Sequence, residues 1–286
     1  MPKENTHAFF AQNVVFDLEK QNPLLAKKIK KNMAYFKMGS YFPDIFFYSS
    51  EFEKISKIIH GENKEKTNQF IFYLLEKISA KDEKSFSFIC GILCHFGLDI
   101  VFHPMIFSLT GDFEKDPSAE YCHIQFETAL DKKLTPALHL EKNLKILKNL
   151  EVIEVIEKYF QIEKTSVYKI YNKHLFFNRL FRIAPLYFIV LFFFKVGLMK
   201  NKKNLGVFYA DASFNKISLP DSFYYENSIS NKKEKCSISE MLDKASLLTI
   251  RYIEGAEKFI RKEISKGKLA EIIKGENLST GKVRND

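Results

Sequence analysis

The chain has 286 residues, of which 46% are hydrophobic and 28% are charged. This balance excludes an intrinsically disordered protein, and the length is enough to bury a sizeable core. The formal charge of +9 favours phosphate-bearing partners such as anionic lipids, small phosphoesters or nucleic acids. Lysine dominates the basic residues, without a dense stripe of arginine and aromatic residues, so no dedicated nucleic-acid groove is evident.

Glycine and proline are scarce, with 11 and 8 residues, which favours long helices joined by few tight turns. We therefore expect an all-α fold, arranged as a single multi-helix domain over residues 1–286. The packing must rely on phenylalanine, since the chain has 29 Phe and no Trp. The four cysteines lack the spacing of a secreted disulfide framework, and the first residues lack an apolar signal segment. These two observations predict a cytoplasmic protein.

Apolar residues at helical spacing predict a first helix from Thr6 to about Lys20 and a second helix after Pro23. Glycine and proline then indicate a loop at residues 38–48. Further elements are expected in the order helix 86–107, helix 119–133, helix 138–160, loop 226–236, and a capping box at 237–240 that opens a last helix to about 266. Residues 275–286 are expected to form a frayed tail.

One segment, residues 183–199, is almost continuously apolar and is interrupted only by Lys195. It is shorter than the roughly 20 apolar residues that a membrane-spanning helix needs. The favoured interpretation is a buried core helix. Two alternatives stay open, namely a surface that contacts a lipid interface and, as the weakest, a true membrane span.

Two ladders of potential metal ligands carry the strongest chemical signal. His95, Asp99 and His103 follow each other at intervals of four residues, and so do His123 and Glu127. Each step of four turns a helix by about 40°, so the side chains of one ladder lie near one face. Imidazole nitrogen and carboxylate oxygen are the ligands of zinc in hydrolytic sites. Any one of these residues alone fits an ordinary hydrogen-bonded core position, but together on apolar helices they favour a compensating cation.

In their order along the chain, these residues resemble the bacterial zinc-dependent phospholipases C. That family shares its helical scaffold and three-zinc site with single-strand nucleases of the P1 and S1 type. The resemblance runs from the first predicted helix to about residue 131 and is weaker in the later helices. It implies eight metal ligands, which are His7, Asp44, His60, His95, Asp99, His103, His123 and Glu127.

The resemblance divides these ligands among two or three zinc ions. The first ion is bound by four side chains, those of Asp44, His60, His95 and Asp99. The second is bound by three, those of His103, His123 and Glu127. Asp99 bridges from the first ion to a third, which His7 completes. In the family the N-terminal residue of the processed chain also binds the third ion, so Pro2, exposed by removal of Met1, is a further candidate ligand.

The function implied by the resemblance is phosphodiester hydrolysis, most of all cleavage of phospholipids into diacylglycerol and a phosphorylated head group. Asp44 is the candidate for orienting or deprotonating the attacking water, and a role as metal ligand only is the equal alternative. The runner-up is a single-strand nuclease or nucleotidase on the same ions. A third hypothesis is a non-catalytic, metal-stabilised protein that docks at membranes. The expected partners are a phospholipid or other phosphodiester and a membrane surface, contacted through residues 183–199.

The remaining residues near the ladders receive supporting roles. His139 and His174 are expected to be surface or structural residues, and Asp131 either supports a ligand or lies on a solvated helix face. Cys94 and Cys122 each precede a ligand histidine and should pack behind the site. The sequence has no Gly-rich phosphate loop, G-x-S-x-G turn or dinucleotide fingerprint, which argues against covalent and nucleotide-cofactor mechanisms.

Overall fold

The protein is described by a computed structural model that covers residues 3–62, 66–111, 116–135, 140, 147, 148, 150–199, 203–215, 219–227 and 232–283. Helices form most of it, and the described residues add one two-stranded antiparallel sheet. The predicted all-α class is therefore confirmed.

The elements before residue 135 build the region of the predicted ligands. They are α1 Glu4–Gln21, α2 Pro23–Lys31, α3 Met33–Tyr41, the 3-10 helix η1 Phe42–Tyr48, α4 Glu53–Ile59, α5 Asn68–Lys77, α6 Glu83–Thr110 and α7 Pro117–Leu134. The later elements are α9 Val152–Phe160, α10 Lys164–Leu180, α11 Ala184–Lys195, α12 Lys203–Gly206, α13 Tyr209–Phe214, β1 Ser222–Asn227, β2 Lys232–Ser237, α14 Ile238–Ile260 and α15 Lys266–Ile272.

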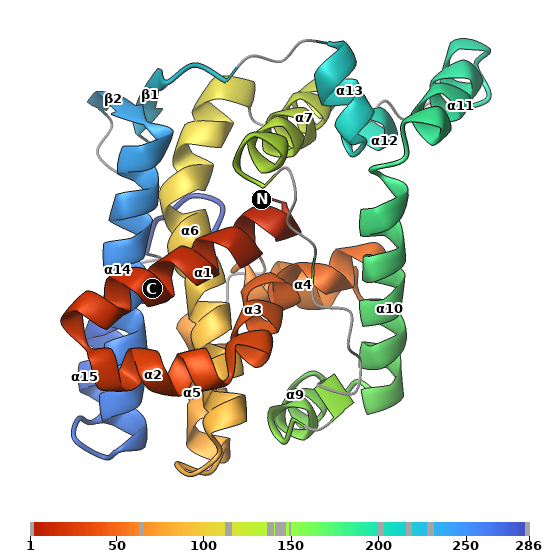
Figure 1. The fold of residues 1–286 in the computed structure, drawn as a ribbon. Helices are drawn as coiled ribbons and strands as arrows, with labels where there is room; N and C mark the ends of the chain where they lie inside the picture. Colours follow the sequence, from red (N-terminus) through yellow and green to blue (C-terminus); the bar gives the residue numbers. More distant parts are fainter. Residues whose placement is uncertain are drawn as a thin grey trace.

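Helix α6 passes through the middle of the molecule, and α3 and α14 pack along it (Figure 1). The contact with α3 depends on two facing glycines. A Cβ atom on Gly39 would lie 1.9 Å from the carbonyl oxygen of Phe88, and one on Gly91 would lie 2.0 Å from that of Phe36. Only glycine permits such close backbone contact. The crossing holds the C-terminal end of α3 against the middle of α6, where the ligand ladder begins.

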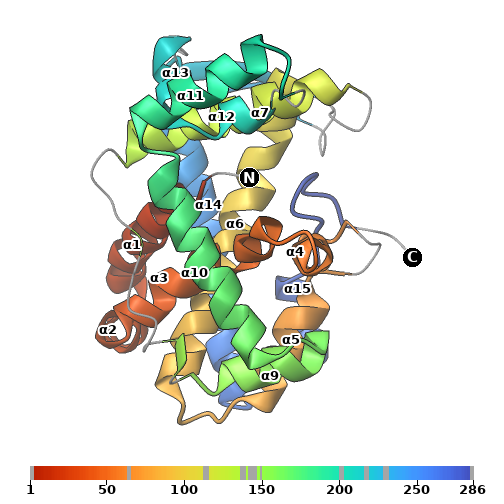
Figure 2. The same cartoon turned by 90° about the vertical axis from the view of Figure 1, so that its right-hand side faces the viewer.

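A smaller group of helices covers one end of the molecule. Helices α11, α12 and α13 lie with α7 in this layer (Figure 2). Its apolar centre consists of four buried side chains, Tyr121, Tyr187, Leu205 and Phe208. The larger core is separate from it and includes buried residues from Ala8 to Leu278.

Several local predictions need correction. Residues 38–48 are not a loop, because α3 and η1 run through them. The predicted loop 226–236 belongs largely to the β1–β2 hairpin, in which Phe223 pairs with Cys236. The hairpin forms because Phe223, Tyr225 and Cys236 point one way into the core. Within the predicted helix 138–160 the described helical residues are 147, 148 and those of α9; residues 150 and 151 are not helical, and most of 136–149 lies outside the described residues.

The last helix was predicted in the right place, and its capping box is present: Ser237 and Glu240 exchange side-chain and backbone hydrogen bonds. It ends at Ile260, and α15 follows as a separate helix. The tail was predicted wrongly over residues 275–283. Leu278 is fully buried, and Asn277 accepts hydrogen bonds from the amides of Ser279 and Thr280, so the segment forms an ordered turn.

The apolar segment 183–199 also differs from its favoured interpretation as a buried core helix. Of α11, only Tyr187 is buried, whereas Phe188, Ile189 and Phe192 are each at least half exposed. It is therefore not a core helix. Among the described helices, α6 is long and apolar enough to cross a membrane, but 94% of its apolar window is buried in the protein. Helices α10 and α11 pass the same test only as a pair, and a 90° bend separates them.

Candidate metal centre

The structure brings all eight predicted ligands together from five separate elements: α1, η1, the C-terminal end of α4, α6 and α7. Every one of them is at most 5% exposed. Their ligand atoms form three groups, within each of which all atoms lie within 4.8 Å of one another. The first group is Asp44, His60 and His95; the second is His103, His123 and Glu127; and the third is His7, His95 and Asp99.

The first group is close to tetrahedral spacing. The Nε2 atoms of His60 and His95 are 3.0 Å apart, and Asp44 Oδ1 lies 3.3 and 3.6 Å from them. Asp99 Oδ2 adds a fourth atom, 3.1 Å from His95 Nε2 and 3.6 Å from His60 Nε2. Four ligands around one zinc ion at ~2.1 Å would stand about 3.4 Å from one another. The distances from each of these two carboxylates to the two imidazole nitrogens therefore have the spacing of a zinc site.

The second group joins the two ladders. His123 Nε2 lies 2.8 Å from Glu127 Oε1, and His103 Nε2 lies 3.9 Å from the same oxygen. The pair on α7 follows from its spacing of four residues on one helix. Two imidazoles and one carboxylate form a three-ligand set that leaves a coordination position open, as catalytic zinc sites do.

The third group shares members with the first. His7 Nε2 lies 3.4 Å from Asp99 Oδ1, and the ring of His7 stacks on that of His95 with centroids 4.0 Å apart. The two oxygens of Asp99 thus face different histidines, Oδ1 toward His7 and Oδ2 toward His95 and His60. A carboxylate in this position can bridge two cations.

The buried polar atoms test whether a cation fits here. Both nitrogens of His7, Asp44 Oδ1 and both oxygens of Asp99 have no hydrogen-bond partner among the described residues. Leaving a buried carboxylate without partners costs several kcal/mol, a large part of the roughly 5–15 kcal/mol by which a folded domain is stable. Bound divalent cations would satisfy one nitrogen of His7 and the oxygens of Asp44 and Asp99, so the residues present fit a metal centre.

Backbone carbonyls hold three of the histidines from behind. The Nδ1 atoms face the carbonyl oxygens at 2.6 to 3.0 Å, in the pairs His60 with Ser56, His95 with Ser40, and His103 with Leu278. Such a bond fixes the ring and keeps the proton on Nδ1, which leaves Nε2 free to bind a metal. The Ser40 carbonyl reaches His95 because Gly39 and Gly91 allow α3 and α6 to touch.

A sequence profile described as zinc dependent phospholipase C matches residues 6–178, more than half of the chain. The chain belongs to the zinc-dependent phospholipase C family. The matched segment contains all eight candidate ligands, and the predicted resemblance is confirmed. Comparisons with curated proteins and with solved structures give no match.

In this phospholipase C family member, the C-terminal tail lies against the metal centre, outside the matched segment. Besides accepting from His103, Leu278 donates its backbone N–H to the carbonyl oxygen of His60 at 3.0 Å. Asn277 Nδ2 donates to the carbonyl oxygen of Gly61 at 2.9 Å. The sequence analysis missed these contacts. A signal was available in the turn-forming residues 275–281, but it does not say what the turn packs on.

Asp131 supports the start of α1, which carries His7. Its Oδ1 accepts hydrogen bonds from the backbone N–H and the hydroxyl of Thr6, at 2.6 and 2.8 Å, and its Oδ2 accepts from Asn5 and Tyr209. Of the two open interpretations, the supporting contact is therefore correct and the solvated helix face is wrong. Burial raises the pKa of Asp131.

A second buried polar cluster lies beside η1. Glu4 accepts a hydrogen bond from Tyr48 and pairs with His174, whose Nε2 lies 3.3 Å from Glu4 Oε1. Burial alone would raise the pKa of Glu4, but the hydrogen bond and charge of His174, with Lys3 and Tyr48, hold it well below its usual value. His174 is fully buried, so it is a structural residue.

The electrostatics of the centre suit metal binding. Burial lowers the pKa of His7 and His123 well below the usual value and that of His103 to about 3, which keeps these rings neutral. The pKa of His60 is raised to about 10, since Asp44 and Asp99 outweigh its burial. A proton on His60 and a bound cation are therefore alternative ways to compensate these carboxylates, and the two would compete.

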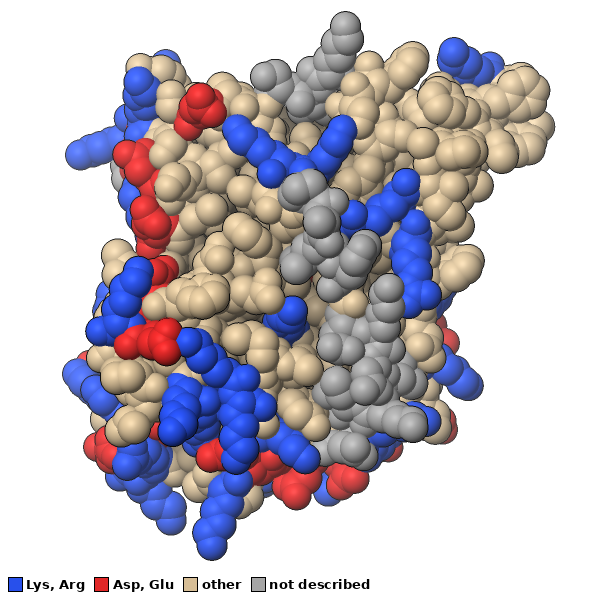
Figure 3. Space-filling view, in the orientation of Figure 1, with Lys and Arg blue, Asp and Glu red and all other residues tan. Residues whose placement is uncertain are grey.

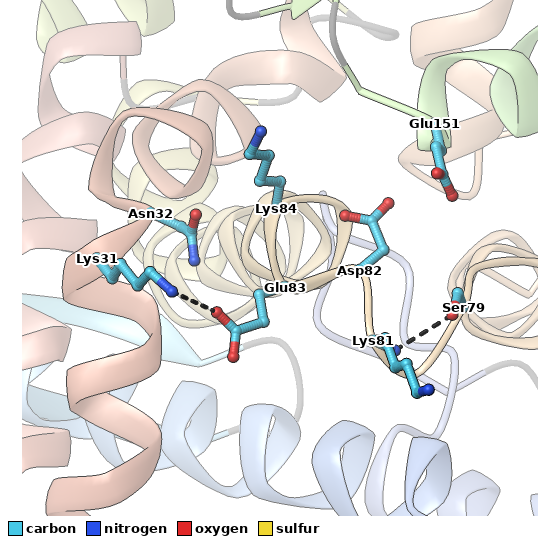
Figure 4. A pocket seen from close by; sticks show the side chains of 8 residues that line it. All are labelled: Lys31, Asn32, Ser79, Lys81, Asp82, Glu83, Lys84 and Glu151. Atoms are coloured by element: carbon cyan, nitrogen blue, oxygen red, sulfur yellow. Dashed lines mark hydrogen bonds and ion pairs between the residues drawn. The ribbon is translucent and has the colours of Figure 1, made fainter.

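Three of the ligands lie at the accessible edge of the centre. The side chains of Asp44, His123 and Glu127 are 6–7% exposed, whereas those of His7 and Asp99 are fully buried. Of these five side chains, the three at this edge are the ones that solvent reaches. A surface hollow elsewhere, lined by charged residues such as Lys31 and Glu83, lies at the N-terminal end of α6 (Figure 4). About 18 Å of helix separates Glu83 from His95, so this hollow is not part of the centre.

The remaining candidates differ in outcome. Cys94 is buried as expected, but Cys122 is exposed, so the prediction that it packs behind the site is wrong. Pro2 and His139 lie outside the described residues.

Proposed function

We propose that this protein is a zinc-dependent phosphodiester hydrolase that cleaves phospholipids into diacylglycerol and a phosphorylated head group. The observation that carries the proposal is the buried carboxylate pair Asp44 and Asp99, whose oxygens lie 3.1 to 3.6 Å from the Nε2 atoms of His60 and His95 in an arrangement that a divalent cation would complete. Membership of the zinc-dependent phospholipase C family supports zinc as the missing cation.

The ligand assignment follows the three groups of atoms. Asp44, His60, His95 and Asp99 would hold one ion, and His103, His123 and Glu127 a second. A third would lie between His7 and the other oxygen of Asp99. Bound zinc supplies Lewis-acid chemistry: it activates water near neutral pH and neutralises charge on the phosphoryl oxygens.

The protein's own residues orient the reacting groups. Asp44 is the catalytic candidate because, of the two central carboxylates, only its side chain reaches the accessible edge. Its carboxylate would accept a hydrogen bond from the attacking water and so fix the direction of attack on phosphorus. Asp99 is fully buried and would only bind metal.

Activity on defined lipids tests the proposal. Zinc-loaded protein should release phosphocholine or phosphoethanolamine from vesicles of the corresponding phospholipid, and a chelator should abolish this release. Asp44→Asn should lower the turnover number, whereas Asp243→Asn, at an exposed position of α14, should leave it unchanged. Release of no head group by protein that demonstrably contains zinc would refute the proposal, and cleavage of single-stranded DNA by the same sample would assign the centre to the nuclease alternative.

A further inference from the structure

Helix α11 is apolar on both of its faces. Tyr187 is buried inward, and Val190 and Leu191 pack against the small apolar centre below. On the outer face, Phe188 is 51% exposed and Phe192 is 60% exposed. A helix at a water-facing surface normally has a polar outer face, and one that is apolar all round is normally covered. The outer face of α11 therefore needs a cover that the described residues do not provide.

The exposed side chains form one surface with the end of the run. Val196 and Leu198 follow α11 and are 51% and 72% exposed. Phe214 of α13 is 63% exposed and lies in ring contact with Phe188, with centroids 6.2 Å apart. We call these residues the α11 surface; they are Ile183, Phe188, Ile189, Phe192, Phe193, Val196, Leu198 and Phe214. In Figure 3 the corner that carries α11 protrudes and is mainly uncharged.

The charge around the α11 surface selects its partner. Between residues 164 and 210 the sequence contains nine Lys or Arg residues and no Asp or Glu. Lys195 is exposed at the end of α11, and Arg179 is exposed on α10 near the bend. Apolar side chains flanked by the exposed Lys195 and Arg179 match an anionic lipid interface, whereas a second copy of this face would bring like charges together.

The length of α11 and its bend relative to α10 limit how deeply this helix can enter a membrane. The 12 residues of α11 span about 18 Å, well short of the roughly 30 Å of a bilayer's hydrocarbon core. Helix α10 meets α11 at 90° and buries Val167, Ile170 and Leu175 in the protein, so it cannot continue the helix into lipid. The geometry fits a helix that lies in the interface with its outer side chains among the lipids.

A row of aromatic rings runs from the inner face of α11 to η1, the element that carries Asp44. Tyr48, in the same 3-10 helix as Asp44, stacks on Phe177 at 5.9 Å, and Phe177 stacks on Phe181 at 5.7 Å. Phe208 follows Phe181 at 5.4 Å and contacts Tyr187 at 6.0 Å. Helices α4, α10 and α11 face the viewer together in Figure 2. Helices α10 and α11 therefore lie on the same side of the molecule as α4, whose C-terminal end carries His60.

We propose that the α11 surface inserts into anionic phospholipid membranes and holds the metal centre at the lipid interface where its substrate lies. This inference rests on the proposed function for the identity of the substrate, but the membrane contact can be measured without catalysis.

The test uses zinc-loaded full-length protein and the double variant Phe192→Ser/Phe193→Ser. Sedimentation with vesicles of phosphatidylcholine and phosphatidylglycerol should show binding that the variant weakens by about tenfold or more, because two inserted rings are lost. Lys195→Ser should weaken binding by roughly fivefold, and raised salt should weaken it further. Phe16→Ser is the matched control, since Phe16 on α1 is 59% exposed, as Phe192 is 60%, yet lies outside the α11 surface.

Activity separates docking from catalysis. The double variant should lose activity on vesicles but keep the kcat/KM of the wild type on a monomeric short-chain phosphatidylcholine. Equal vesicle binding by the wild type and the double variant would overturn the inference, and so would a wild-type dimer that the variant converts into monomers without any change in vesicle binding. Vesicle binding that depends on the α11 surface, with no hydrolysis of either substrate, would support the inference and refute the proposed function instead.

Discussion

The metal centre and α11 place their side chains in opposite ways. In the centre, imidazoles and carboxylates are at most 5% exposed inside the core. On α11, Phe192 is 60% exposed at the surface. Both arrangements are unfavourable for an isolated chain in water, since buried charge and exposed apolar surface each raise its free energy. The contrast teaches that each region is built for a partner from outside the chain, cations for the first and, in our proposal, lipid for the second.

Removing the shared carboxylate should have the largest effect. Asp99→Asn takes a negative charge from two of the ligand groups. We expect loss of bound zinc and a fall in kcat/KM of roughly 10³-fold or more, since a catalytic metal contributes several kcal/mol. Elemental analysis and head-group release measure the two effects. Asp243→Asn is the control, and an Asp99→Asn protein with full zinc content would contradict the assignment.

The glycine contact behind the centre comes next. A Cβ atom in Gly91→Ala would lie 2.0 Å from a backbone oxygen of α3, so the helices must separate. We expect the free energy of unfolding to fall by about 3 kcal/mol, at the upper end for overpacked cores. Denaturant titration measures it. Gly267→Ala in α15, where the nearest atom would lie 3.8 Å away, should be neutral or slightly stabilising, and similar losses in both variants would argue against a role for the α3–α6 contact.

Shortening the tail tests how the centre depends on distant sequence. A chain that ends at Glu276 keeps the bond from Thr67 to the Glu276 carbonyl but loses the Leu278 contacts with His103 and His60. We expect zinc affinity to fall by about 10–100-fold, as for other outer hydrogen bonds of metal ligands, with helix content unchanged. Competition with a zinc indicator measures affinity. A chain that ends at Val283 serves as the control, and equal affinities would remove the tail from the site.

Low pH should destabilise the folded protein through the buried polar cluster around Glu4. The pKa of Glu4 is lower in the folded protein than its usual value of 4.5, so its stabilisation is fully present above 4.5 and is lost progressively as pH falls from there through the lower pKa of the folded state. Glu4→Gln should cost on the order of 1–2 kcal/mol at neutral pH. The difference in the free energy of unfolding between the wild type and Glu4→Gln should shrink as the pH falls below 4.5, the usual pKa of Glu4. Denaturant unfolding of both proteins at neutral pH and at several values below 4.5 tests this prediction. A difference in the free energy of unfolding that grows in acid would contradict it.

The smallest effect is expected on the outer face of α11. Phe192→Ser should change the free energy of unfolding by less than about 0.5 kcal/mol, because the ring contacts little of the protein. Tyr187→Phe, on the inner face of the same helix, removes a hydrogen bond to Asp211 and should cost about 1 kcal/mol. Thermal unfolding of Phe192→Ser, Tyr187→Phe and the wild type measures both losses of stability. A large loss from Phe192→Ser would show that the outer face is covered by the protein itself.

The local part of the metal centre could be predicted because helical spacing is a property of consecutive residues. Intervals of four place His95 and Asp99, or His123 and Glu127, on one helix face whatever surrounds them. The family resemblance supplied the residues that come from separate elements, such as His7 and His60. The contact of the tail with His103 could not be predicted, because it uses the backbone carbonyl of Leu278, which any residue possesses.

The sequence by itself determined the helical class, the capping box at Ser237 and the set of residues able to bind metal. Only the tertiary structure decided that α11 is exposed, that residues 275–283 are packed, and that the two oxygens of Asp99 face different histidines. The physical reason is that periodicity and composition report which faces of an element are apolar. Whether such a face is covered, and by which distant segment, depends on packing between elements that no local pattern encodes.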